Sequence, residues 1–216
     1  MPRPRVHDLD QVLNVAERIV LDGPERLTVR RLSAESGVPN GAIYHAFGSL
    51  AAVRGRMWLR AADDFLTLQT DLIDAEMGVA ATPGFDDAAR ATIAAADAPA
   101  AFAERRPAAA RMLMTVRREQ LFGPDLPEDL ADALLRLDRR LVSEVLARLA
   151  SALWGRRDAP SVEVVTTCVV DLPTALLHRA FSQAAVDIPV QITADVRGRL
   201  AVAVRAIIDR EPPKSG

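Results

Sequence analysis

Side chains that could read nucleic acid gather in the segment NGAIYH, which begins at Asn40. Asn40 can form two hydrogen bonds with one adenine, and the methyl group of Ala42 can contact a thymine methyl. Gly41 allows the backbone to approach DNA closely, and the Tyr44 hydroxyl is a natural donor to a phosphate. Together with His45, these residues predict contact with double-stranded DNA.

Three further residues could contact phosphates from outside this segment. Thr28 precedes a helical stretch, where its hydroxyl can cap the helix and lie beside a bound phosphate. Arg3 and Arg5 precede the first expected helix on an arm that could reach a minor groove. Each of these residues has an alternative interpretation without DNA contact. The arm could be an ordinary disordered terminus, Tyr44 could belong to the core, and His45 could be exposed to solvent only.

A second group of chemically capable side chains lies near the C-terminus. Cys168, Asp171 and His178 follow the spacing i, i+3, i+10, which predicts one shared helix face. A carboxylate and an imidazole there could orient a polar ligand. Alternatively, Asp171 caps the helical segment after a kink at Pro173, and His178 is hydrogen-bonded within the protein or exposed. Catalysis would require the side chains to touch, but Cys168 and His178 would lie about 15 Å apart along one helix.

Other catalytic and metal-binding patterns are missing from the chain. It contains no HExxH, GxSxG or glycine-rich phosphate loop. Cys168 is the only cysteine, so neither an intrachain disulfide nor a CxxC metal site can form. The sequence therefore predicts a protein that is not an enzyme and that has no metal and no cofactor.

The charge distribution is uneven along the 216 residues. The net charge is −2, yet residues 1–60 carry more basic than acidic side chains and residues 61–216 carry more acidic ones. This asymmetry weakly favours a polyanionic partner for the N-terminal part. The N-terminus turns acidic where a signal peptide would be apolar, and no run of about 18 apolar residues stands out. We therefore expect a cytoplasmic protein that does not bind a membrane.

Helical periodicity runs through almost the whole chain, and no segment alternates as a strand would, which predicts an all-α fold. A small N-terminal unit, 1–48, and a helical body, 49–216, are expected as two domains joined by a long fourth helix. The predicted helices cover residues 9–20, 29–36, 41–47 and about 50–76, followed by 86–96, 98–105, 107–121, 127–154, 161–185 and 190–209.

The second and third predicted helices form a helix-turn-helix. Thr28 begins the second helix and Gly37 ends it as a residue that tolerates the left-handed conformation. Asn40 is expected to cap the short third helix. Ile43 and Phe47 lie four residues apart and should face inward. A unit of this kind lays its second helix in the major groove of DNA.

The stretch LTVRRLSAESGVPNGAIYHAFGSLAAV, together with the helix before it, resembles the DNA-binding domain of TetR-family regulators over residues 9–55. The resemblance implies that Thr28, Asn40 and Tyr44 touch phosphates or bases. It places Gly41, Ala42 and His45 on the recognition-helix surface.

Two positions depart from the family's pattern. Ala46 stands where the family usually has a histidine or arginine, and Leu50 stands where it usually has a lysine or arginine. Losing two cationic contacts should lower the salt dependence of log K by roughly 2 units. Neighbouring arginines could compensate; the candidates are Arg30, Arg31, Arg54 and Arg56.

The resemblance also implies a homodimer through the last two helices. Apolar stripes that suit such pairing are Val162, Val165 and Val169 on one helix and Ile192, Val196, Leu200, Val204 and Ile207 on the other. These stripes could instead be intrachain core.

A ligand pocket is implied inside the body, beneath the fourth helix. Apolar side chains with a few polar groups typically line such pockets, although these side chains could equally be plain core. The candidates are Phe65, Phe102, Met112, Leu113, Val116 and Trp154, with Cys168, Asp171 and His178 as polar or weakly polar members.

These observations together predict a ligand-responsive DNA-binding transcriptional regulator. We expect a repressor that binds a palindromic operator as a dimer and is released by a small-molecule effector. One alternative is a TetR-like protein with weakened DNA binding that acts through a protein partner or a ligand. A helical-bundle enzyme is the third interpretation, and it lacks any motif.

Overall fold

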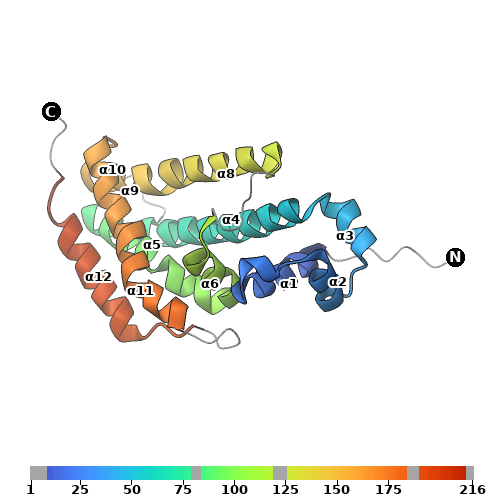
Figure 1. The fold of residues 1–216 in the computed structure, drawn as a ribbon. Coiled ribbons are helices and arrows are strands. Elements are labelled where there is room, and N and C mark those ends of the chain that lie inside the picture. Colours follow the sequence, from blue (N-terminus) through green and yellow to red (C-terminus); the bar gives the residue numbers. More distant parts are fainter. Residues whose placement is uncertain (1–8, 79–83, 119–125, 184–189, 213–216) are drawn as a thin grey trace.

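A computed structural model describes residues 9–78, 84–118, 126–183 and 190–212, in which every regular element is a helix (Figure 1). The all-α prediction is confirmed. In chain order the elements are α1 (Leu9–Leu21), η1 (Pro24–Arg26), α2 (Val29–Ser36), α3 (Asn40–Phe47), α4 (Leu50–Met77), α5 (Phe85–Arg105), α6 (Pro107–Thr115), α8 (Glu128–Arg140), η2 (Leu141–Leu146), α9 (Ala147–Trp154), α10 (Ala159–Thr166), η3 (Thr167–Asp171), α11 (Leu172–Gln183) and α12 (Ala194–Ile208).

The helix-turn-helix forms from local signals. Thr28 Oγ1 accepts from the backbone N–H of Arg31 at 3.2 Å and caps α2. Gly37 ends that helix in the left-handed conformation, at φ 71°. Ile43 and Phe47 are buried against the core, as their spacing predicted. The sequence signals therefore set both helix ends and the inward face of α3.

The start of α3 differs from the expectation by one residue. Pro39, not Asn40, is the N-cap, and no side chain caps the helix there. The carbonyl of Pro39 accepts from the N–H groups of Ala42 and Ile43, and its restricted φ of −58° suits the start of a helix. The prediction that Asn40 caps α3 is wrong, and its side chain is exposed at the first helical position.

The long helix α4 runs from the N-terminal unit to the far end of the molecule (Figure 1). Ser49 caps it by accepting from the Ala52 N–H at 3.0 Å. Apolar side chains of α4 join those of α1, α6 and α11 in one continuous buried cluster. The N-terminal unit and the body therefore share a core across α4.

Helix α5 is continuous where two helices were expected. It passes through Asp97 and Pro99 without a break. A proline lacks the N–H that would bond to the carbonyl four residues earlier. Here the Gln69 side chain from α4 replaces it, since Nε2 donates to the Ala95 carbonyl at 2.9 Å. This tertiary hydrogen bond satisfies the backbone group that the proline leaves free.

The predicted helix 107–121 ends earlier, because the chain is extended at Val116. Two β-branched residues, Thr115 and Val116, weaken helix propensity at this point. At the C-terminus, α12 begins four residues later than predicted. Thr193 Oγ1 accepts from the Val196 N–H at 3.4 Å and caps the helix there.

Two long predicted helices, 127–154 and 161–185, each contain a π-helical turn. One is η2, between α8 and α9; the other is η3, between α10 and α11. A π turn inserts an extra residue into a helix and rotates the following side chains relative to the preceding ones. Cys168 is buried within η3, whereas Asp171 and His178 are exposed. The prediction that these three side chains share one face is therefore wrong.

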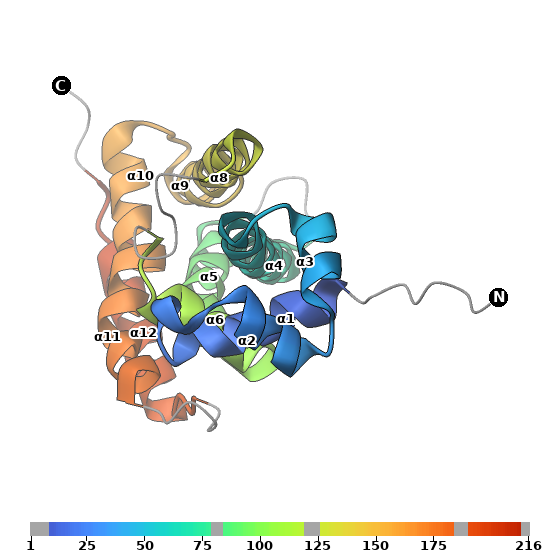
Figure 2. The same ribbon diagram turned by 45° about the vertical axis from the view of Figure 1, so that its right-hand side comes forward.

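The segment from α10 to α11 lies with α12 at the end of the molecule remote from α3 in both ribbon views (Figures 1 and 2). Its stretch Ala159–Ser182 is long and apolar enough to meet a membrane-span test, with a mean hydropathy of 1.3. Core helices of soluble proteins meet the same test. Only 33% of the apolar window is buried inside the chain, and Leu176 is the large apolar side chain of this stretch that is exposed among the described residues.

Candidate DNA interface and effector cavity

The outer surface of α3 carries most of the residues predicted to meet DNA. Asn40, Gly41 and His45 are exposed, and Tyr44 keeps 53% of its surface accessible. Ala42 is half-buried and packs against the core, so it offers only part of its methyl group. The alternative that Tyr44 belongs to the core is excluded by its exposure.

Gly41 has no role that the fold itself requires. A Cβ built at this position would meet nothing within 4 Å, and its φ lies outside the left-handed region. Glycine inside a helix costs roughly 1 kcal/mol relative to alanine. The intramolecular contacts therefore do not explain why this position holds a glycine.

The two departures from the family pattern are half-buried. Ala46 and Leu50 both pack against the core. The carbonyl of Ala46 accepts from Arg56 Nη1 at 3.2 Å, and the Arg56 guanidinium lies 5.6 Å from the centre of the Phe47 ring. An exposed cation from α4 thus lies at the C-terminal end of α3, beside position 46.

The other nearby arginines are not equivalent to Arg56. Arg31 donates to Glu35 at 2.6 Å and to Asp22 at 2.7 Å. These bonds raise the pKa of its guanidinium and commit it to two carboxylates. Arg54 donates to backbone carbonyls of the η1 region. Arg30 is exposed. Arg3 and Arg5 lie outside the described residues.

A cavity of about 270 Å³ lies in the body between α4, α5, α6, α8 and the second π turn. Its wall is mostly apolar. Side chains that line it include Trp58, Ala62, Phe65, Leu66, Pro99, Phe102, Ala110, Leu113, Met114, Leu137, Leu141, Val169, Val170 and Pro173. The interruptions of the helices gather here, because Pro99, Leu141 and the η3 residues all contribute to the wall.

Three of the predicted pocket residues line the cavity. Phe65 and Phe102 form an edge-to-face pair with ring centres 5.6 Å apart, and Leu113 lies nearby in the wall. Six predicted members do not line it: Met112, which is fully buried in the core, Val116, Trp154, Cys168, Asp171 and His178. Trp154 instead packs against the second buried cluster.

The structure explains why the polar residues predicted for the pocket do not line the cavity. Burial raises the pKa of the Cys168 thiol to about 12, so the group is a neutral core side chain. His178 Nε2 lies 3.2 Å from Ser182 Oγ on the exposed side of α11. The polar cavity residues that sequence reasoning missed are Gln69, Arg118, Asp138 and Thr174. Their separation along the chain left no local signal to find them.

No protein-family model matches the sequence, and no curated protein matches it. Solved structures do match. A protein from Rhodococcus sp. assigned to the TetR-family transcriptional regulators superposes with a TM-score of 0.58 at 17% identity, over 92% of this chain and 97% of that one. The TetR family transcriptional regulator PfmR from Thermus thermophilus gives a TM-score of 0.54 at 16% identity, over the same shares of the two chains.

The chain has the TetR-family fold. The likeness extends over the body as well as the N-terminal unit, because it covers nearly all of both chains. The sequence resemblance covers residues 9–55, whereas the structural likeness also covers the body up to α12.

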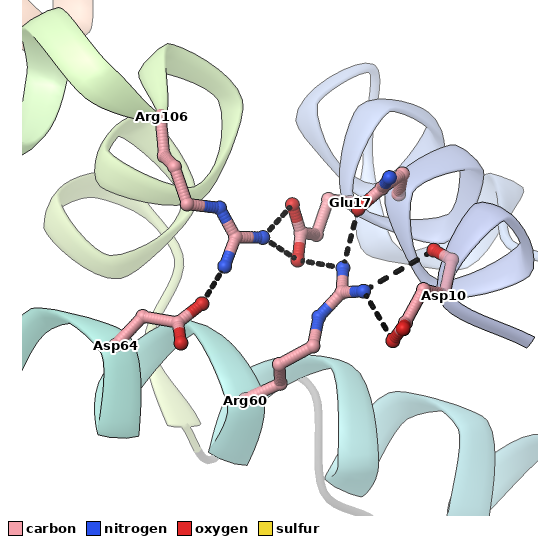
Figure 3. Close-up of polar contacts among 6 residues, drawn as sticks. Asp10, Glu17, Arg60, Asp64 and Arg106 are labelled. Atoms are coloured by element: carbon pink, nitrogen blue, oxygen red, sulfur yellow. Dashed lines mark hydrogen bonds and ion pairs between the residues drawn. The ribbon is translucent and has the colours of Figure 1, made fainter.

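Within this TetR-family fold, a group of ion pairs around the buried carboxylate of Glu17, here called the Glu17 cluster, joins the N-terminal unit to the body (Figure 3). Glu17 of α1 is only 3% exposed. It accepts from Arg60 of α4 at 2.6 Å and from Arg106, between α5 and α6, at 2.9 and 3.1 Å. Arg106 also pairs with Asp64, and Arg60 with Asp10. A carboxylate of the N-terminal unit is thus held by one arginine of α4 and one at the junction of α5 and α6.

The described part of the chain offers no metal site. No group of three or more histidine, cysteine, aspartate or glutamate side chains is arranged to hold an ion there.

Proposed function

We propose that this protein is a DNA-binding transcriptional regulator that acts in the cytoplasm as a repressor. The observation that carries the proposal is α3, a short helix anchored by Ile43 and Phe47 with Asn40, Tyr44 and His45 exposed. The TetR-family fold supports it, since similar folds belong to transcriptional regulators. Asn40 reads a base edge, and Tyr44 and Thr28 contact phosphates.

A homodimer through the outer faces of α11 and α12 fits the apolar surface at that end. The stripes predicted from sequence are largely intrachain core, since Val165, Val169, Leu200 and Val204 are buried. The exposed apolar side chains are different ones: Leu176 is 40% exposed and Val202 is 71% exposed. Two-fold pairing through them would present two α3 helices to a palindromic operator.

The proposed effector binds in the body cavity and shifts the population between two conformations. The Glu17 cluster provides a physical connection, because Arg106 follows directly after α5, which lines the cavity with Phe102. A movement of α5 or α6 would be transmitted to α1 through this ion pair. Release from DNA follows when the two α3 helices no longer match successive major grooves.

The proposal is tested by selecting genomic fragments with the purified full-length protein and measuring binding across salt concentrations. Enrichment of a palindromic site is the expected result. Asn40→Ala should change the preferred base at one position of each half-site, whereas Tyr44→Phe should weaken all sites alike. Absence of an enriched palindrome even at low salt would exclude operator binding.

Arg56 gives a sharper test of how the interface compensates for Ala46. Arg56→Gln should reduce the slope of log K against log salt concentration by about 1. Arg31→Gln is the matched control, because Arg31 is already committed to Asp22 and Glu35. Equal slopes for the wild type and Arg56→Gln would remove Arg56 from the interface.

One alternative function follows from the two departures. Ala46 and Leu50 replace cations usual in the family, which favours weakened DNA binding and action through a protein partner or the ligand alone. The same selection decides between the two. An absent palindrome combined with effector binding supports this alternative.

A further inference from the structure

We propose that the cavity takes a small, neutral, largely hydrophobic molecule that carries one hydrogen-bond donor, received by Gln69 Oε1. The inference rests on the proposed effector role of the cavity and adds the chemical class of its ligand. Size, wall chemistry and the states of the polar wall residues each contribute to the assignment.

The volume sets the size of the ligand. Drug-sized ligands occupy pockets of about 300–1,000 Å³, and an apolar cavity of about 150 Å³ holds a benzene ring. The 270 Å³ observed lies between these values. A bicyclic molecule, or one ring with a short substituent, fits this range. The edge-to-face pair of Phe65 and Phe102 and the indole of Trp58 suit a flat apolar face.

Gln69 sets the polarity of the ligand. The residue lines the cavity and is 1% exposed. Its Nε2 is committed to the Ala95 carbonyl, which fixes the orientation of the amide. Its Oε1 accepts no hydrogen bond from any described residue. A buried acceptor without a partner costs about 1–3 kcal/mol, so a ligand that donates to Oε1 recovers an interaction that the protein alone lacks.

The charged wall residues disfavour an anionic ligand. Arg118 donates to both carboxylate oxygens of Asp138, at 2.9 and 3.0 Å, and its guanidinium lies 5.0 Å from the Trp58 ring centre. A carboxylate ligand would have to displace Asp138 to reach this guanidinium. The hydroxyl of Thr174 donates to the Val170 carbonyl. Among the polar side chains of the described wall, Gln69 is the one with a buried acceptor atom that has no hydrogen-bond partner.

Three matched probes test the chemical class on the full-length protein by titration calorimetry. We expect 2-naphthol, which donates one hydrogen bond, to bind about tenfold more tightly than 2-methoxynaphthalene, which cannot donate. The anion 2-naphthoate should bind most weakly. Equal affinities for naphthol and its methyl ether, or tighter binding of naphthoate, would overturn the assignment.

A pair of variants separates the ligand contact from the structural role of Gln69. Pro99→Ala restores a backbone N–H for the Ala95 carbonyl, so Gln69 is no longer needed there. In this background, Gln69→Met should abolish the preference for naphthol over its methyl ether while the protein stays folded. Retention of the preference in the double variant would overturn the role of Gln69.

The cavity-filling variant Ala110→Leu distinguishes this inference from the proposed effector site. If Ala110→Leu abolishes probe binding but the wild type binds naphthol and its methyl ether equally, only the proposed chemical class of the ligand is refuted. Probe binding that survives filling refutes the cavity as the effector site, and the assignment of Gln69 falls with it. Loss of binding together with a naphthol preference supports both.

Discussion

The helices of the N-terminal unit end at capping residues, whereas those around the cavity are interrupted within their own length. Thr28, Gly37 and Ser49 set helix ends near α3 through local hydrogen bonds or backbone conformation. Around the cavity, Pro99 lies inside α5, and π turns separate α8 from α9 and α10 from α11. Each of these interruptions contributes to the wall. The comparison indicates that uninterrupted helices in the N-terminal unit present the surface of α3, whereas interrupted helices in the body leave a cavity between them.

The two regions meet at Glu17, so this residue gives the largest predicted effect. Glu17→Ala should lower the free energy of unfolding by about 3–5 kcal/mol, because it leaves Arg60 and Arg106 without their buried partner. Urea unfolding measures the change. Asp10→Ala is the matched control, since the Asp10 side chain is 79% exposed and its contact with Arg60 should contribute little. Similar losses in both variants would contradict a special role for the buried carboxylate.

The interruption in α5 gives the next largest effect. Gln69→Met should cost about 1–3 kcal/mol, since the buried Ala95 carbonyl loses its donor. The same substitution in the Pro99→Ala background should cost much less, because a backbone N–H then serves that carbonyl. A double-mutant cycle by urea unfolding measures this coupling. Additive costs would show that the proline and the glutamine are independent.

In the N-terminal unit, a substitution at Gly41 should have a smaller effect. It should stabilise the fold and weaken operator binding. Gly41→Ala should raise the free energy of unfolding by about 0.5–1 kcal/mol, because the helix gains propensity and the new methyl group meets no neighbour. The same change should weaken operator binding by obstructing close approach of α3. Thermal unfolding and a binding titration on one preparation measure both. A stabilised variant with unchanged affinity would place Gly41 outside the interface.

The smallest effect concerns the start of α10, beside the interrupted region. Hydrogen bonds from Ser161, followed by Arg156, lower the pKa of Asp158 to about 2. The lowered pKa means that the charged group stabilises the fold above its unfolded pKa of about 3.9, and that this contribution is lost as the pH falls towards 2. The Tm difference between the wild type and Asp158→Asn should therefore shrink from pH 6 to pH 2. A constant difference would contradict the linkage.

Sequence reasoning succeeded where signals are local. The cap at Thr28, the left-handed Gly37 and the inward pair Ile43 and Phe47 act within a few residues of chain, and all lie as predicted. It failed at Cys168, Asp171 and His178, because a π turn rotates one part of the helix against the other. It also divided α5 near Pro99, since the donor that keeps the helix whole comes from α4.

The sequence by itself determined the all-α class, the helix-turn-helix and the exposed surface of α3, because hydrophobic periodicity and caps act over short distances. Only the tertiary structure decided the cavity, the unused acceptor of Gln69, the placement of Arg56 beside Ala46 and the burial of Glu17. Each of these depends on helices that are remote in the chain packing together. Residue spacing within one helix carries no record of the partner that another helix will bring.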